Sequence, residues 1–310
     1  MENNVQNDTQ YDDVIDLREL FGVLWAGSRK IIAITAVFAF VSVIYALSVP
    51  NQYKATVLLA PAQSDSSALS GALGKLGGLA SLAGVSVGGG ASTEGQIAQE
   101  IMKSWSFIDG FITENNIAVE VYAAEGWNKG SNALEINNDA YDEEANEWLV
   151  ADETGAIGPP NSWELFNAFN QKLSISEDKK SGLVSLSIEY YSPLIAKQWV
   201  DMYVESINRF MQQRQVDRVS RNIDYLQQQV GKTSISEMRE VFYSIIEEQT
   251  KNKMIAEASP DYAFVAVGPS MVPKQKSQPQ RAFICILGTL LGGMLSMLLV
   301  LVTHYARKPD

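Results

Sequence analysis

The side chains that most often carry out catalysis are scarce in this chain. It contains one cysteine, Cys285, and one histidine, His304, and both lie in or beside the same apolar run. A Ser-His-Asp triad or a histidine-based metal site needs such side chains to converge with others in one place. A lone cysteine forms no internal disulfide, and the sequence has no Cys-x-x-Cys pattern. The sequence therefore predicts no catalytic centre and no metal site.

Two short segments resemble the end of a phosphate-binding P-loop. Gly231-Lys232-Thr233 has the right ending, but the signature needs a glycine where Leu226 stands. Gly74-Lys75 fails as well, because Leu76 replaces the required Ser or Thr. We therefore expect no nucleotide and no other cofactor.

Four carboxylates gather in a polar, turn-rich stretch. A solvated acidic loop explains them best, and paired acid–base catalysis is a weaker interpretation. A site for a divalent cation is a further alternative, because such ions prefer carboxylate oxygens. The four residues are Asp142, Glu143, Glu144 and Glu147.

Charge is distributed unevenly along the chain. The formal net charge is −12, so nucleic-acid phosphates should be repelled and we expect no nucleic-acid partner. Charged residues make up 19% of the chain, below the usual quarter, because two long stretches carry none. This pattern is typical of a membrane protein with a folded aqueous domain.

The uncharged stretches are residues 31–49 and 282–303. Each is long enough to cross a hydrocarbon core about 30 Å thick. The first begins behind an acidic tail and is longer than the apolar core of a signal peptide, so we favour a retained span over a cleaved signal.

Two spans place both ends of the chain on one side of the membrane. Arg29 and Lys30 precede the first span, and Arg307 and Lys308 follow the second, which indicates that this side is the cytoplasm. Basic residues before the second span argue the other way, but a loop this long translocates largely regardless of charge. We therefore predict a cytoplasmic tail over 1–30, spans over 31–49 and 282–303, a periplasmic domain over 50–281 and a cytoplasmic tail over 304–310.

The residues before the first span have a helical pattern of their own. Apolar side chains recur at helical spacing over 12–30, and Trp25 suits the headgroup level of a bilayer. This predicts a short amphipathic helix at the cytoplasmic surface. The alternative is that the segment simply extends the first span.

Glycines and prolines mark the second span and its approach. Gly288 and Gly292 form a GxxxG pattern with Gly293 adjacent, and small residues at this spacing let membrane helices approach closely. Glycine is common in membrane helices, so a specific helix pairing and a chance occurrence are both open. The prolines that should keep the approach extended are Pro269, Pro273 and Pro279.

Alternating side chains predict strands in the periplasmic domain over 52–62 and 183–190, and residues 262–267 look like a third. Residues 64–92 are rich in Ser, Gly and Ala and predict a flexible loop with a short helical piece. Residues 116–160 are acidic and rich in turns. One helix is expected over 94–115, with a face formed by Ile97, Ile101, Trp105, Ile108 and Ile112.

From Pro193 onward the apolar period becomes helical. It predicts a long helix over 193–230 and a return helix over 236–256. The stripe is too narrow for burial in a large core and favours a coiled-coil-like contact, either between these two helices or with neighbouring chains. It consists of Val200, Val204, Ile207, Met211, Ile223, Leu226 and Val230.

Four segments carry a resemblance to a known family: IDLRELFGVLW, QYKATVLLAPA, SPLIAKQWVDMYVESIN, and MVPKQKSQPQR before the glycine-rich second span. The chain resembles the Wzz-type chain length determinants, which are polysaccharide co-polymerases of bacterial surface-glycan assembly. The resemblance covers nearly the whole chain and is weakest over 116–160. No kinase domain follows Arg307, so the chain resembles the O-antigen type.

The resemblance implies an α+β fold, in which two transmembrane helices flank a periplasmic domain with a mixed sheet base and a long, extended, coiled-coil-like helix. It further implies closed rings in the inner membrane, commonly octamers. Such proteins act with a Wzy-type polymerase on undecaprenyl-diphosphate-linked glycan, set its modal length and form no glycosidic bonds.

We therefore expect a non-catalytic regulator of O-antigen-like chain length. A periplasmic sensor or adaptor of the inner membrane is the alternative. A membrane-anchored hydrolase is disfavoured by the single histidine and the lack of a GxSxG motif.

Overall fold

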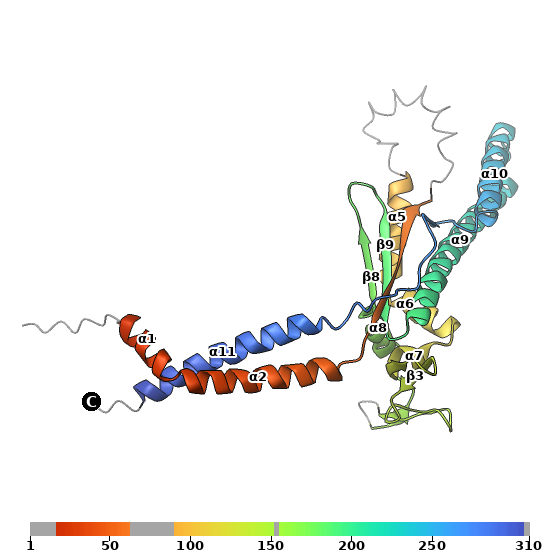
Figure 1. The fold of residues 1–310 in the computed structure, drawn as a ribbon. Helices are drawn as coiled ribbons and strands as arrows, with labels where there is room; N and C mark the ends of the chain where they lie inside the picture. Colours follow the sequence, from red (N-terminus) through yellow and green to blue (C-terminus); the bar gives the residue numbers. More distant parts are fainter. Residues whose placement is uncertain (1–16, 63–89, 152–154, 307–310) are drawn as a thin grey trace, which may run out of the picture. The chain divides into compact units, whose positions relative to one another are not determined.

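The computed structural model describes residues 17–62, 90–151 and 155–306 (Figure 1). They fall into two compact units, one from Met1–Pro50 with Pro279–Asp310 and one from Asn51–Gln278. Residues 12–16 of the predicted amphipathic segment, most of the Ser/Gly/Ala-rich segment, and Arg307 and Lys308 lie outside the described residues.

In its described residues, the first unit, the membrane unit, contains three helices. These are α1 (Leu17–Ala26), α2 (Ser28–Ser48) and α11 (Arg281–Tyr305). By length and composition, α2 and α11 are able to cross a membrane. The chain turns at Gly27, where an added Cβ would lie 2.4 Å from Cγ1 of Val300 on α11. The segment before the first span is therefore a separate helix and not an extension of it.

The second unit, the aqueous unit, is built on a four-stranded sheet with the order β10-β1-β9-β8. Its strands are β1 (Tyr53–Pro61), β8 (Leu173–Glu177), β9 (Val184–Tyr190) and β10 (Phe264–Ala266). Every pairing in it is antiparallel. Val57, Leu186 and Ile175 lie side by side across three strands, so the alternating residues of each strand build one apolar face.

In the part of the chain that the structure describes, four helices cover or flank this face. They are α5 (Gly90–Lys103), α6 (Trp105–Glu114), α8 (Ser162–Asn170) and the first half of α9 (Pro193–Lys232). The single helix expected over 94–115 is wrong, because the chain leaves helical geometry at Ser104 (ψ 145°). The Ser104 side chain then accepts a hydrogen bond from the backbone N–H of Phe107 and begins α6. Of the predicted helix face, Ile97 and Trp105 are exposed, whereas Ile108 and Ile112 are buried.

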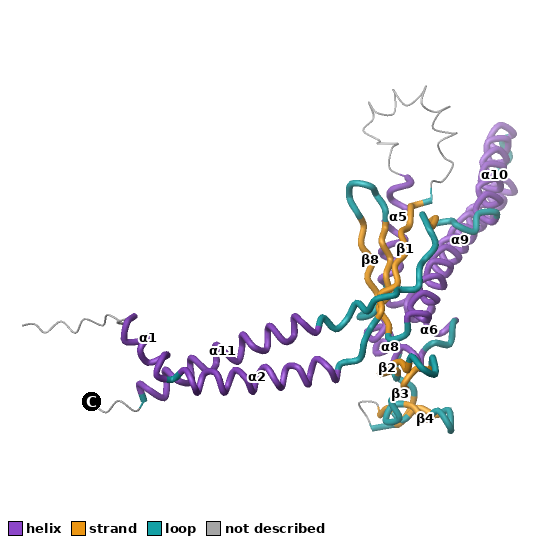
Figure 2. The backbone as a smooth tube through the Cα atoms, in the orientation of Figure 1, coloured by secondary structure: helices purple, strands orange, loops and turns teal. Residues whose placement is uncertain are grey.

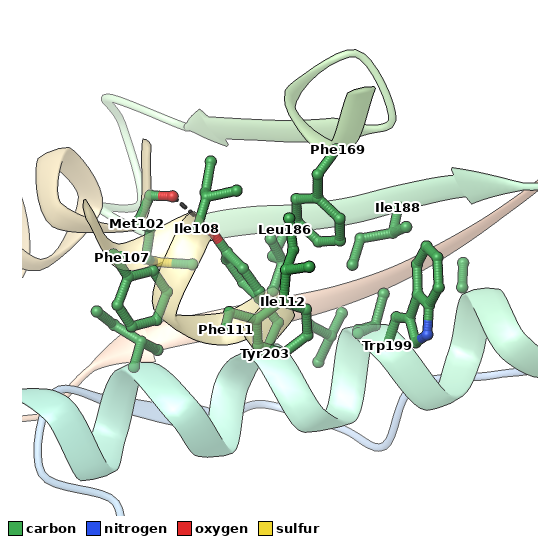
Figure 3. Close-up of a cluster of buried hydrophobic side chains, with 14 of the residues drawn as sticks. Met102, Phe107, Ile108, Phe111, Ile112, Phe169, Leu186, Ile188, Trp199 and Tyr203 are labelled. Carbon is green, nitrogen blue, oxygen red and sulfur yellow. Dashed lines mark hydrogen bonds between the residues drawn. The ribbon is translucent and has the colours of Figure 1, made fainter. Parts of the chain in front are cut away.

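The core lies between the sheet and the first half of α9 (Figure 3). Tyr203 of α9 is fully buried and contacts the rings of Phe107, Phe111 and Phe169 at centroid distances of 5.3, 4.8 and 5.6 Å. Its hydroxyl donates to the carbonyl oxygen of Met102. The expectation of a stripe too narrow for a core is therefore wrong for this half of α9, because Trp199 and Tyr203 widen its buried face.

The second half of α9 leaves the sheet and pairs with α10 (Ser236–Glu257) as a helical hairpin (Figure 2). A short turn at residues 233–235 joins the two helices. The Gln212 side chain of α9 donates to the carbonyl oxygen of Ala256 at 2.9 Å and closes the lower end of the hairpin. The two helices thus pack antiparallel within one chain, which is one of the two arrangements that the stripe allowed.

The described residues of 116–160 form more regular structure than a turn-rich loop. After the short helix α7 (Ala118–Tyr122) come three small hairpins. Their strands are β2 (Ala124–Asn128), β3 (Ala133–Ile136), β4 (Tyr141–Asp142), β5 (Glu147–Trp148), β6 (Val150–Ala151) and β7 (Ile157–Gly158). Asn132 and Asn146 supply the positive φ values of two of the turns. Edge-to-face ring contacts such as Tyr141–Trp148, with centroids 5.0 Å apart, hold this module together.

The predicted fold class is confirmed: the structure combines helices and a sheet, a long helix and two candidate membrane helices. The base sheet differs in one detail, since it was expected to be mixed and its pairings are all antiparallel.

A buried amide fastens α9 to the edge of the sheet. The Asn208 side chain is 3% exposed, and its Nδ2 donates to the carbonyl oxygen of Phe264 at 2.8 Å. Its Oδ1 accepts from the backbone N–H groups of Ala263 and Phe264 at 2.9 and 2.8 Å. One side chain therefore pairs with the backbone groups at the start of β10, a strand of only three residues.

We expect Asn208→Ala to lower the free energy of unfolding by about 2 kcal/mol, because it leaves three buried backbone groups without partners. Urea unfolding of the full chain in detergent, followed by circular dichroism, measures the change. Gln213→Ala, on the exposed side of the same helix, is the matched control and should cost less than about 0.5 kcal/mol. Equal losses in both variants would contradict the role given to Asn208.

Candidate functional site

Within the described ranges, the residues considered above for chemistry occupy structural positions. No group of three or more His, Cys, Asp or Glu side chains within these ranges is placed to hold a metal ion. In the acidic stretch, Oδ1 of Asp142 accepts from the backbone N–H groups of Glu144 and Ala145, so this carboxylate stabilises a turn. Gly231 and Lys232 lie at the end of α9 and not between a strand and a helix. The remaining predicted residues lie at contacts between helices and between segments of the chain.

The predicted glycines lie at the closest contact of the membrane unit. A Cβ added to Gly288 would lie 2.5 Å from Cβ of Ser42, and one added to Gly292 would lie 2.4 Å from Cβ of Phe38. Near this contact, Oγ1 of Thr35 and Oγ of Ser296 are 3.4 Å apart and share a hydrogen bond. The GxxxG face of α11 is thus turned toward α2 of the same chain, where the absent side chains let the two backbones approach.

Gly293 takes a different position. An added Cβ there would meet no atom closer than Oγ1 of Thr35, at 4.0 Å. Of the three glycines, Gly288 and Gly292 are therefore the two whose small size the contact between α2 and α11 requires.

The predicted prolines belong to an extended segment between β10 and α11. Pro269 is exposed, Pro273 is half-buried and Pro279 is buried. Hydrogen bonds hold the segment along the aqueous unit: Ser270 donates to Asp201, and the backbone N–H of Ser277 donates to the carbonyl oxygen of Gln52 at 2.8 Å.

The two ends of the aqueous unit are joined to each other. The backbone N–H of Gln52 donates to the carbonyl oxygen of Gln278 at 3.0 Å, and the two residues form an isolated antiparallel bridge. Nζ of Lys276 also donates to Oδ1 of Asn51 at 3.3 Å. The chain therefore enters and leaves this unit at one place, next to the residues that lead to the two candidate spans.

The predicted stripe of the long helix is divided between two environments. Its first four residues lie in the base, where Val200, Ile207 and Met211 are buried and Val204 is half-buried. Its last three residues, Ile223, Leu226 and Val230, are half-buried on the hairpin formed with α10.

Comparison with known proteins gives one family. The family model described as Wzz, chain length determinant protein, matches residues 13–115. The resemblance to Wzz-type chain length determinants is confirmed. The matched residues include α2, β1, α5 and α6, which are the first candidate span and a large part of the base.

Two solved structures are similar over most of the chain. A full-length bacterial polysaccharide co-polymerase has a TM-score of 0.41 and 14% sequence identity, and the similarity covers 94% of this chain and 98% of that one. A fragment of WzzB, the polysaccharide co-polymerase from Salmonella Typhimurium, has a TM-score of 0.31 and 13% identity over 74% of this chain and all of that one. No curated protein matches the sequence.

Within the base, the half-buried side chain of Lys172 joins two helices, and no sequence pattern indicates this role. Nζ of Lys172 donates to the carbonyl oxygen of Val121, at the end of α7, at 3.1 Å. It also donates to the carbonyl oxygen of Ala168, in the last turn of α8, at 3.0 Å. Burial lowers the pKa of Lys172 to about 8, because the ammonium ion loses water without gaining a carboxylate partner. The side chain ties the 116–160 module to the base.

Tyrosine hydroxyls make similar connections. The Tyr190 hydroxyl, at the end of β9, donates to the carbonyl oxygen of Glu120 at 2.6 Å. Burial, followed by the nearby Glu120 carboxylate, raises the pKa of Tyr190 above its ordinary value, so the hydroxyl keeps its proton and acts as a donor. Such bonds between distant segments follow no local pattern, so sequence analysis passed over them.

We expect the Gly292→Ala variant to separate α2 from α11, because its new Cβ has no room beside Phe38. Disulfide formation between Thr35→Cys and Ser296→Cys in native membranes, with Cys285→Ala as the background, reports this contact. Its yield should fall severalfold in Gly292→Ala and stay unchanged in Gly293→Ala, where there is space. A loss of the same size in both variants would contradict the assigned contact.

The stability of the aqueous unit should rise between pH 8 and pH 10. The pKa of the Lys172 amine is about 8 in the folded chain and 10.5 in the unfolded chain. In this pH range the amine is therefore neutral in the folded chain but still protonated in the unfolded chain. Below pH 8 both states carry the proton, so the cost of burying the charge is present in full. Urea midpoints of the full chain at pH 7 and pH 9 measure the rise.

Lys172→Met should remove this contribution, whereas Lys180→Met, in the exposed turn between β8 and β9, should retain it. If Lys172→Met shows the same rise as the unaltered chain, then another group is responsible.

Proposed function

We propose that this protein is a non-catalytic regulator of the chain length of a surface polysaccharide of the O-antigen kind. The match of residues 13–115 to the chain length determinants carries the proposal, because it spans the first candidate membrane helix and the base that follows it. Two candidate membrane helices, close in sequence to the two ends of one aqueous unit, support it further.

In this proposal the chain is held in the inner membrane by α2 and α11. Both ends lie in the cytoplasm, as the basic residues beside the two spans favour, and Asn51–Gln278 forms the periplasmic domain. The copies assemble into a closed ring, expected to be an octamer. The ring presents repeated surfaces to a Wzy-type polymerase and to its undecaprenyl-diphosphate-linked glycan.

The chemistry belongs to the polymerase in this mechanism. The regulator contributes geometry: a base whose two ends adjoin each other, and a helical hairpin that extends from the base. A ring of fixed size offers the growing glycan a surface of limited length. Once the glycan is longer than this surface, the balance between its extension and its release changes.

Deleting the gene from its host should leave the polysaccharide synthesised but abolish its modal length. The expected change is a shift toward shorter chains, because extension then ends at random. Silver-stained gels of lipopolysaccharide measure the distribution, and complementation with the full chain should restore it. Complete loss of the polymer would point to an enzyme or an export component, and an unchanged distribution would favour a periplasmic sensor or adaptor.

A further inference from the structure

The hairpin of α9 and α10 carries opposite charges on its two outer sides. The side of α9 turned away from α10 forms the basic face, which we define as Arg214, Arg218, Arg221, Tyr225 and Lys232. The side of α10 turned away from α9 forms the acidic face, which we define as Glu237, Glu240, Tyr243 and Glu247. Every side chain of both faces is exposed, and Tyr225 and Tyr243 are 61% and 60% exposed.

Helical spacing produces the two faces. Residues at intervals of three and four lie on one side of a helix, and both faces follow such intervals. Val219, Ile223 and Leu226 occupy the opposite side of α9, where they are buried or half-buried beside α10. The two faces therefore point away from each other across the hairpin.

Most of these charges find no partner within the chain. Among the described residues, Arg218 pairs with Glu94 at 3.6 Å, and no ion pair occurs for Arg214, Arg221 or Lys232. The glutamates of the acidic face form none either. Like charges three and four residues apart destabilise an isolated helix. A single copy thus has two unfavourable rows of charge that a complementary surface would relieve.

The charges also match in height. Arg221 lies eleven residues before the end of α9 at Lys232, and Glu247 lies eleven residues after the start of α10 at Ser236. At about 1.5 Å per residue, both lie about 16 Å below the tip of the hairpin. Tyr225 and Tyr243 are each seven residues from the same ends.

One basic residue lies on the acidic side of α10, and it too has an oppositely charged residue at the same distance from the hairpin tip. Lys251 lies on this side of α10, one turn below Glu247. Lys251 lies fifteen residues after Ser236, and Asp217 lies fifteen residues before Lys232, so the two are at the same distance from the hairpin tip. Asp217 is at the border of the basic face. A neighbour placed at equal height would therefore bring opposite charges together at this level too.

We propose that the basic face of one copy packs against the acidic face of the next copy, so that hairpins join side by side around the ring. Copies related by rotation about an axis along the hairpin meet at equal height. This places Arg221 opposite the acidic face of the neighbour, and it places Tyr225 level with the neighbour's Tyr243. Two different faces meeting in this way form a heterologous contact, which builds a ring when the rotation between neighbouring copies closes. The inference rests on the ring assembly of the proposed function and names the surfaces that build it.

Cysteine pairs test the contact in native membranes, in the full chain with Cys285→Ala as the background. R221C/E247C should give a ladder of disulfide-linked oligomers after oxidation, whereas R221C alone and E247C alone should give none. N222C/E247C is the matched control, because Asn222 is exposed but turned about 100° from Arg221, and it should also give none. Dimers from the single variants would show that like faces meet and would overturn the proposal.

Charge reversal gives a second readout. R221E and E247R should each reduce the large assembly that the protein forms in detergent, and R221E/E247R should restore it, because the exchanged pair is again complementary. If the assembly is indifferent to all three changes, the interface is wrong, although the ring stands. In that case, weaker binding of an acidic polysaccharide by R221E would assign the basic face to the glycan. If the unaltered protein runs as a single chain, the ring fails, and the proposed function fails with it.

Discussion

The packing of the first half of α9 against the apolar face of the antiparallel sheet is the constraint on which the aqueous unit depends. Tyr203 lies at its centre, within ring contact of Phe107, Phe111 and Phe169. Because its hydroxyl reaches Met102 and Asn208 holds β10, this helix fixes α5, α6, α8 and the edge of the sheet at once. The hairpin has a defined direction because it continues from the first half of α9, which is held in the core.

A second constraint lies where the chain enters and leaves the unit. The bridge between Gln52 and Gln278 joins residues that are far apart in sequence, and it brings together the connections to both candidate spans. In the membrane unit, Gly288 and Gly292 let α2 and α11 meet closely along their length. The aqueous unit thus joins its two ends, and the membrane unit joins its two long helices. Both contacts suit a protein whose proposed role is to present a stable shape.

Charge has the least influence on the fold and the most on the proposed assembly. The exposed ion pairs along α9, such as Lys197–Asp201 at 2.5 Å, join neighbours on one helix and contribute little to stability. The basic and acidic faces contribute nothing to the core. Their opposite signs and equal heights instead specify which surfaces of two copies attract and which repel, and this is how electrostatics usually confers specificity.

The sequence by itself determined the features that depend on local periodicity and composition. These are the two uncharged stretches, the alternating strands β1 and β9, the long helix from Pro193 and the Wzz resemblance, since each is visible within a short window. Tertiary structure alone decided which half of the stripe is core, that Ser104 divides α5 from α6, and that the GxxxG face meets α2. It also decided the roles of Lys172 and Asn208. Asn208 bonds to Phe264 and Lys172 bonds to Val121, each more than fifty residues away in the sequence. A side chain's burial also depends on what folds over it, which no local pattern encodes.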